Sequence, residues 1–260
     1  MFVTWLTEMI ESMRNRLVLL LALFMLFART SAQVGEYRNE FSVGVNGGYV
    51  MSSVGFTPTV SQSQHGGITG GFSMKYESEK YFNSICALYA EVNYAQLGWK
   101  ENNLDANDQP VINQITGLKE EYSRTANYIQ VPIFAHLGWG RERKGVQFFF
   151  QAGPQFGYLM SESTKMNFNF NDRNMDQRIN KTCAQDTMSI EHRFDYGIAA
   201  GLGLEYTMPN VGHFLLEGRY YFGLGNIYGD SKRDYFSKSN YGNVVIKLSY
   251  LFDIIKTKNL

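Results

Sequence analysis

Residues 194–206 read FDYGIAAGLGLEY, and apolar side chains occupy every second position of this stretch. A period of two indicates an extended strand whose two faces meet different surroundings. The alternate positions hold mainly glycine and alanine, with Asp195 and Glu205 near the two ends. A face of small residues suits the crowded interior of a small closed barrel, and the apolar face suits contact with lipid. The stretch therefore predicts a membrane-spanning β-strand.

Seven further segments repeat this alternation, and each is long enough for a tilted strand to cross a bilayer. They are residues 41–51, 66–76, 84–100, 128–139, 146–160, 213–224 and 241–252. Pro132 interrupts the fourth strand in chain order, and because proline has no amide hydrogen we expect a β-bulge there. Together the eight segments predict an all-β fold, an eight-stranded antiparallel up-and-down transmembrane β-barrel.

The connections between these segments alternate between long polar stretches and short turns. Outer-membrane barrels have long outer loops and short periplasmic turns, so the alternation predicts that both chain ends lie in the periplasm. Outward aromatic residues also gather at the strand ends, which is typical of the two aromatic girdles at membrane interfaces. They are Tyr49, Tyr94, Tyr158, Tyr196 and Phe222 at one rim and Tyr76, Trp139, Tyr206, Tyr250 and Phe252 at the other.

The amino terminus has the pattern of an export signal. Residues 17–27 read LVLLLALFMLF after Arg14 and Arg16, a run too short to span a bilayer as a helix. Small residues end the region at Ala32, so we predict a signal peptide over residues 1–32, cut before Gln33, and a barrel domain over residues 33–260. An uncleaved anchor is the alternative, and Met13 is an alternative start.

The overall charge argues against a nucleic-acid partner. The chain has 24 basic and 24 acidic residues and no basic run, whereas phosphate binding needs a concentrated positive field. The partner that the alternation implies is outer-membrane lipid. Cys86 and Cys183 fall near opposite ends of the predicted barrel, so we expect no disulfide, and Cys86 reads as a small apolar residue facing lipid.

Charged residues occupy inward positions of the predicted strands. The interior of an eight-stranded barrel is just wide enough for its own side chains, and unpaired charges there are costly. We therefore interpret these residues as a hydrogen-bonded polar plug with a structural role, and a selective channel or proton path is the alternative. The predicted plug residues are Lys75, Glu91, Asp195, Glu205, Glu217, Arg219 and Lys247.

Motifs for catalysis or for cofactor and metal binding are missing from the sequence. None of the spacings resembles HExxH, GxSxG or a CxxC pair, so we expect no enzyme activity and no cofactor. Of the histidines, only His65 and His192 fall near the predicted outer rim, where Glu191 and Asp195 are close to His192 in sequence. A lipid-modifying barrel enzyme is thus the least favoured alternative.

Four short stretches carry a resemblance to a known family: YAQLGWK (94–100), NYIQVP (127–132), AGPQFGY (152–158) and VVIKLSYLF (244–252). Together they resemble the PorT-type outer-membrane β-barrel family of Bacteroidetes, over essentially the mature chain. Ala95 replaces a common serine, and Ile129-Gln130-Val131 replaces a Leu-x-Ile core. The resemblance implies an outer-membrane location, an accessory role in type IX protein secretion or envelope assembly, and partners among those proteins. The alternative is a structural or narrow-channel barrel with no secretion role.

Overall fold

The computed structural model describes residues 36–141, 144–229 and 234–256, and the predicted signal peptide (1–32) lies outside them. No helix within these ranges is long and apolar enough to cross a membrane. The strands are β1 (Glu36–Thr57), β2 (Gln62–Ser63), β3 (His65–Tyr81), β4 (Ser84–Glu101), β5 (Tyr122–Gly140), β6 (Gly145–Met166), β7 (Phe194–Met208), β8 (Gly212–Gly223) and β9 (Lys238–Ile255). Two single 3-10 turns, η1 (Phe170–Asp172) and η2 (Ala184–Asp186), lie between β6 and β7.

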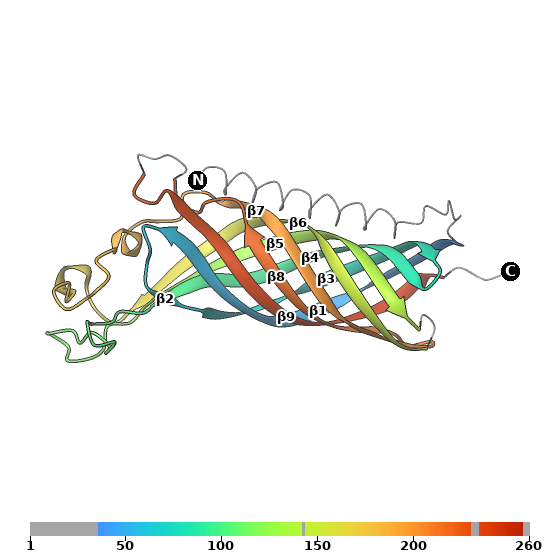
Figure 1. The fold of residues 1–260 in the computed structure, drawn as a ribbon, viewed down its shortest axis with the longest axis horizontal. Helices are drawn as coiled ribbons and strands as arrows, with labels where there is room; N and C mark the ends of the chain where they lie inside the picture. The colour runs from blue at the N-terminus through green and yellow to red at the C-terminus, as the bar shows by residue number, and fades with distance from the viewer. Residues whose placement is uncertain (1–35, 142–143, 230–233, 257–260) are drawn as a thin grey trace, which may run out of the picture. The chain divides into compact units, whose positions relative to one another are not determined.

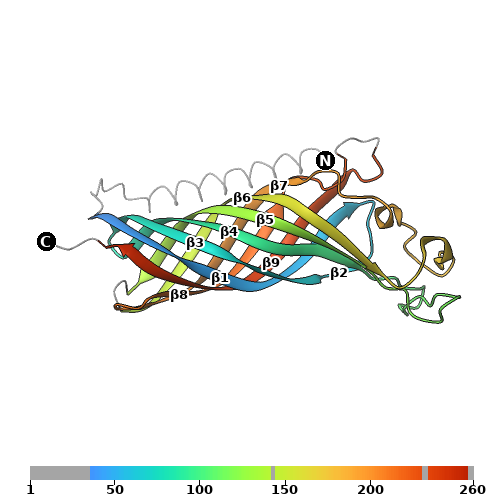
Figure 2. The ribbon, with the colours of Figure 1, turned by 180° about the vertical axis from the view of Figure 1, so that it is seen from behind.

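The strands form a closed antiparallel ring (Figures 1 and 2). Neighbours in sequence pair around the wall, β1 pairs with β9, and β4 pairs with β5, which leaves the ring without a free lateral strand. The two-residue β2 adds only to the last two residues of β4, Lys100 and Glu101. The predicted eight-stranded up-and-down barrel is thus confirmed, with β2 as a small addition to it.

Long and short connections separate to opposite ends of the barrel, as the sequence predicts. Residues 58–64, 102–121, 167–193 and 224–237 connect strands at one end, which we call the outer end (Figure 1). The short turns lie at the other, inner end, where Phe41 of β1 pairs with Ile255 of β9. In the turn from β7 to β8, Asn210 adopts a positive φ of 63°, a conformation that asparagine tolerates well.

Strand β7 follows the predicted alternation over its whole length. Its residues alternate strictly between exposed and buried, from exposed Phe194 to exposed Met208. Gly203 faces the interior at a point where a Cβ atom would lie 2.2 Å from the Leu216 carbonyl oxygen and 2.6 Å from the Phe149 ring. Glycine is therefore required there because the opposite side chain and the adjacent backbone occupy the space.

Several strands extend further toward the outer end than predicted. β1 runs to Thr57, β5 begins at Tyr122 and β6 runs to Met166. In the extensions of β1 and β5 the alternation is inverted: Phe56 and Tyr122 are buried inside, and the outward Thr57 is exposed. The extension of β6 is exposed at every position from 161 to 165. Because this part of the wall lies beyond the lipid-facing aromatic residues, its outer face meets water and its inner face forms a core.

The predicted bulge at Pro132 is wrong. β4 and β5 pair at Ala90–Ile133 and again at Asn93–Gln130, so the register is unchanged across the proline. The ladder lacks pairs between these positions, and β5 and β6 also lack pairs between Ala135–Ala152 and Pro132–Gln155, a gap that contains Pro154. Because Pro132 and Pro154 have no amide hydrogen, ladder pairs are missing beside them, but no extra residue is inserted. The shift in register between β5 and β6 lies instead at Asn127/Tyr128.

Candidate functional site

The inner half of the barrel contains an ion-paired layer around Glu205. Lys75 lies with its Nζ 2.8 Å from Glu205 Oε2 and 2.9 Å from Glu77 Oε1. On the other side, His213 Nδ1 lies 2.8 Å from Glu205 Oε1, and His213 Nε2 lies 2.9 Å from Asp253 Oδ1. Lys75 and Glu205 are almost completely buried, so each charge is compensated within this layer.

A second ion-paired layer lies around Glu91. Its Oε2 accepts hydrogen bonds from Arg219 Nη1 at 2.9 Å, Lys247 Nζ at 2.8 Å and Asn93 Nδ2 at 2.7 Å. Arg219 Nη2 also lies 2.5 Å from Glu217 Oε1, and its guanidinium group sits 4.5 Å from the centre of the Phe134 ring. Two carboxylates and two cations are thus held in one buried group.

Asp195 is separate from both ion-paired layers. All seven residues of the predicted plug are buried in the barrel, and six of them pair with one another. The carboxylate of Asp195 instead accepts a hydrogen bond from Tyr221 at 2.7 Å. Its Oδ1 atom has no hydrogen-bond partner among the described residues.

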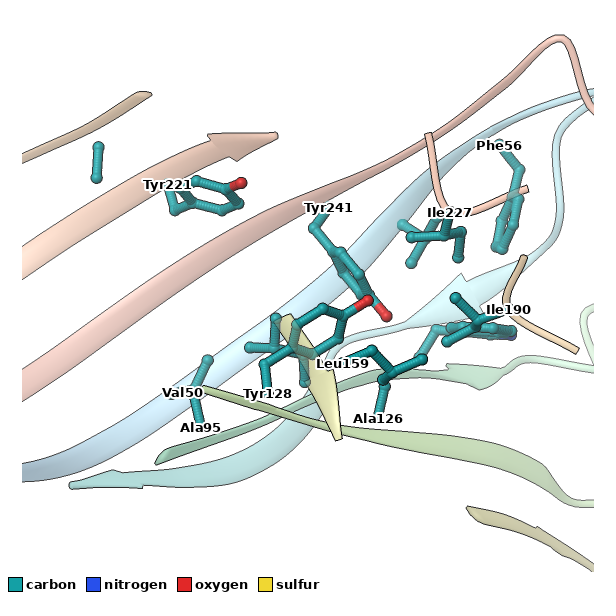
Figure 3. Close-up of a cluster of buried hydrophobic side chains, with 14 of the residues drawn as sticks. Val50, Phe56, Ala95, Ala126, Tyr128, Leu159, Ile190, Tyr221, Ile227 and Tyr241 are labelled. Carbon is teal, nitrogen blue, oxygen red and sulfur yellow. The ribbon is translucent and has the colours of Figure 1, made fainter. Parts of the chain in front are cut away.

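Above these layers, large aromatic side chains fill the outer half of the interior. We call Phe56, Trp99, Tyr228 and Phe236 the aromatic cap; the Phe56 ring lies 5.4 Å from Trp99, 6.2 Å from Tyr228 and 4.9 Å from Phe236. Figure 3 shows Tyr128 and Tyr241 pointing toward each other in the same cluster, with ring centroids 5.7 Å apart. The polar layers and the cap together obstruct the bore.

The outer loops are joined by buried polar contacts. Glu120 of the 102–121 loop pairs with Arg178 of the 167–193 loop at 2.7 Å, and both side chains are almost fully buried. Burial alone would raise the pKa of Glu120, but the Asn174 amide and the Arg178 guanidinium group lower it below its ordinary value. Asn113 Nδ2 also donates to the Asp172 carbonyl at 2.7 Å. The two longest loops are therefore one ordered surface.

The described side chains do not form a recognisable catalytic arrangement. Ser42 Oγ donates to Asp253 Oδ1 at 2.6 Å, and Asp253 in turn contacts His213. The hydroxyl thus meets the carboxylate and not the imidazole, whereas an activated serine needs the base beside it. Of the rim histidines, His65 contacts Thr125 at 3.2 Å. Among the described residues, no group of three or more His, Cys, Asp or Glu side chains could hold a metal ion.

Sequence reasoning missed the aromatic cap and the buried loop contacts. Inward Trp99 belongs to a strand that the sequence predicts, but its burial follows from the inverted alternation beyond the lipid. Arg124, which donates to the backbone carbonyls of Met188 and Asp186, lies in a stretch that reads as a polar loop. Residues 122–128 read YSRTANY, and their period of two, with Tyr122, Ala126 and Tyr128 on one face, is the signal from which the inward aromatic residues of this strand could have been predicted.

A closed antiparallel ring with an apolar outer face and a polar inner layer defines an outer-membrane β-barrel protein. Residues 31–229 match the family described as "Outer membrane protein beta-barrel domain". The chain belongs to this family, and its location is the outer membrane.

Several solved outer-membrane proteins are similar to this chain at low sequence identity and low TM-score. The attachment invasion locus protein Ail of Yersinia pestis is 11% identical, covering 82% of this chain and 99% of Ail, with a TM-score of 0.32. Neisserial surface protein A is 11% identical over 82% of this chain and 97% of its own, with a TM-score of 0.36. OprG of Pseudomonas aeruginosa is 12% identical over 84% and 98%, with a TM-score of 0.38. No curated protein matches the sequence.

Proposed function

We propose that this outer-membrane barrel is a non-enzymatic accessory of protein secretion or envelope assembly, similar to the PorT-type barrels of Bacteroidetes and acting with type IX secretion proteins. In this proposal the barrel is a closed anchor and the outer loops meet the partner. The observation that supports it most is the contrast between an obstructed interior and an ordered outer surface.

The interior offers little to a transported solute. Lys75, Glu91, Glu205 and Arg219 fill its polar layers with paired charges, and the aromatic cap lies above them. A bore of eight strands leaves little room beyond such side chains. This arrangement supports an anchor rather than a channel, which is the alternative role for a barrel of this size.

The outer loops offer exposed groups that the barrel itself does not need. Ile115 and Leu118 of the 102–121 loop are 72% and 60% exposed. A pocket of about 370 Å³ beside them is lined in part by Asn113, Thr116 and Asn167. Loops held by a rigid scaffold are where binding residues are commonly found, so this surface is the candidate contact for an envelope protein.

Deleting the gene and measuring export of secreted protease and surface cargo tests the secretion role. We expect cargo to accumulate in the periplasm and expect the wild-type gene to restore export. A chain carrying Ile115→Ser and Leu118→Ser should be present in the membrane but restore export poorly. Ile198→Ser, on the lipid face of β7, is the control that shows whether the loss of any exposed apolar side chain impairs export. Normal export in the deletion strain would disprove the secretion role.

Conductance in planar bilayers tests the channel alternative separately. The purified barrel should produce no steady single-channel steps because its interior charges are paired and its outer half is filled. Reproducible conductance with normal cargo export would favour a narrow channel. Lipid A and phospholipid profiles with and without the protein should be the same, and a changed acylation pattern would instead indicate a lipid-modifying enzyme.

A further inference from the structure

The connection between β6 and β7 crosses back over the outer mouth of the barrel. We call residues 167–193 the outer strap. Near its middle Gln185 Nε2 donates to Glu101 Oε1 at 2.8 Å, and near its end Glu191 and His192 donate their amides to the Ile227 carbonyl at 3.0 and 3.2 Å. Ile190 of the strap is buried in the apolar cluster that includes the aromatic cap (Figure 3). The strap therefore covers the cap.

Two acidic side chains meet where the strap contacts the wall. Glu101 is the last residue of β4, and Asp186 belongs to η2 in the strap. They are only 5% and 2% exposed, and Gln185, which precedes Asp186 in η2, donates to Glu101 Oε1, so both carboxyl groups belong to one buried contact. Two ionised carboxylates buried together repel each other, and neither has a donor to offer the other, so one proton stabilises this contact.

The remaining hydrogen bonds leave a place for that proton. Asp186 Oδ2 pairs with Arg173 at 2.7 Å, but Asp186 Oδ1 has no partner among the described residues. A protonated Glu101 would supply the missing donor. Buried acceptors without a donor are destabilising, so the protonated pair is the better-satisfied state of this contact.

Charged and titratable groups from every neighbouring element face this pair. Arg173 and Arg178 come from the strap, and the second of these is already paired with Glu120 of the 102–121 loop. From β5, Arg124 donates to the Asp186 carbonyl oxygen rather than its carboxylate, and Tyr122 lies nearby. Tyr228 of the 224–237 connection completes the surroundings. None of these cations forms an ion pair with Glu101 within the described chain.

We propose that Glu101 and Asp186 form a proton-dependent latch that holds the outer strap on the barrel mouth and weakens as the pH rises. Opening the latch would uncover the aromatic cap without breaking the membrane-spanning ring. Glu101 lies seven residues beyond Tyr94 of the outer aromatic rim, on the aqueous side of the wall.

The direction of the pH effect follows from the raised pKa of the Glu101 carboxyl group. Burial, together with the neighbouring Asp186, raises the pKa of Glu101 from its ordinary 4.5 to about 8. The closed strap therefore keeps a proton that the released strap gives up between pH 4.5 and 8. Its closure is strongest below pH 4.5, weakens by up to about tenfold per pH unit through that window, and stays at the weakened level above pH 8.

Limited trypsin digestion of the folded barrel in detergent micelles can measure release of the strap. Arg178 is 3% exposed, so cleavage after it requires the strap to lift, whereas exposed Lys119 reports trypsin activity at each pH. Under single-hit conditions, with fragments identified by mass spectrometry, the ratio of Arg178 to Lys119 cleavage should rise about tenfold from pH 7 to pH 9.

Glu101→Gln should abolish this rise, because a glutamine amide donates a hydrogen bond at every pH. Glu162→Gln is the matched control: Glu162 also contacts the strap, through the Ile190 amide, and its loss should leave the pH dependence intact. If Glu101→Gln does not yield a heat-modifiable folded band, Asp186→Asn takes its place: burial still raises the pKa of Glu101, but without the neighbouring carboxylate the rise in the cleavage ratio should be smaller than in the wild type. A flat wild-type ratio, or an equal rise in the wild type and the Glu101→Gln or Asp186→Asn variant, would overturn the latch.

Discussion

Replacing Glu91 with glutamine should destabilise the barrel more than any change of similar size on its surface. Glu91 is fully buried, and its Oε2 atom lies 2.9 Å from Arg219 Nη1 and 2.8 Å from Lys247 Nζ. The substitution keeps the side-chain volume but leaves the layer with two cations and only Glu217 to balance them. The layer thus carries an uncompensated buried charge.

The expected magnitude follows from these contacts. An ion pair at about 4 Å contributes about 4 kcal/mol at an effective dielectric constant of about 20, and Glu91→Gln loses two such attractions. The cost of burying the carboxylate, several kcal/mol, is no longer incurred, so the two effects partly cancel. We expect a net loss of about 3–5 kcal/mol in the free energy of unfolding, the range typical of a broken buried pair.

Urea unfolding in lipid vesicles, followed by heat-modifiable migration and tryptophan fluorescence, can measure this loss. Lys247→Gln alone should also be destabilising, because it leaves Glu91 with less compensation. The double variant Glu91→Gln/Lys247→Gln restores equal numbers of charges, so its loss should be smaller than the sum of the two single losses by about 2–3 kcal/mol. A loss below about 1 kcal/mol for Glu91→Gln, or simple additivity, would refute the interpretation of this layer as a coupled ionic unit.

Substitutions at two sites test the packing of the wall and the cap, and a thiol titration tests the cysteines. Gly203→Ala should destabilise folding because its Cβ would meet the neighbouring backbone at 2.2 Å, whereas Gly218→Ala, with nothing within 4 Å of its Cβ, should unfold like the wild type in the same urea titration. Phe56→Ala should cost about 3–5 kcal/mol and change the fluorescence of the buried tryptophan in the cap; an unchanged spectrum would contradict the packing described. Cys86 and Cys183 are both free, so thiol titration of the denatured, unreduced chain should give two thiols per molecule, and fewer would indicate a disulfide.

The membrane-spanning part of the fold was predictable because one physical contrast controls it. Each residue of β7 faces either lipid or a crowded interior, so its sequence alternates without interruption from Phe194 to Met208. The alternation of long and short connections then indicated at which end of the barrel each connection and both chain ends lie. A pattern of local alternation contains no information on missing ladder pairs, and this is why the gap at Pro132 was misread as a bulge.

The outer part of the protein was less predictable because the contrast changes there. Beyond the bilayer the outside of the wall meets water, and inward Phe56, Trp99 and Tyr122 form an ordinary core. A search for strands whose apolar residues face outward therefore stops too early at the outer ends of β1, β5 and β6. Inward positions of the plug residues followed from strand parity, but the separation of Asp195 from the ion pairs depends on distances across the bore that no single strand encodes.

The seam between β1 and β9 has a consequence for how the chain order relates to the fold. Phe41 lies beside Ile255 at the inner end, so the first and last strands are neighbours in the same way as any other pair. A ring of this kind has no intrinsic beginning. A short linker across the seam, combined with new ends opened in the 102–121 loop, should give a circularly permuted chain with the same barrel, since the wall is defined by its cyclic sequence of neighbours and not by where synthesis starts.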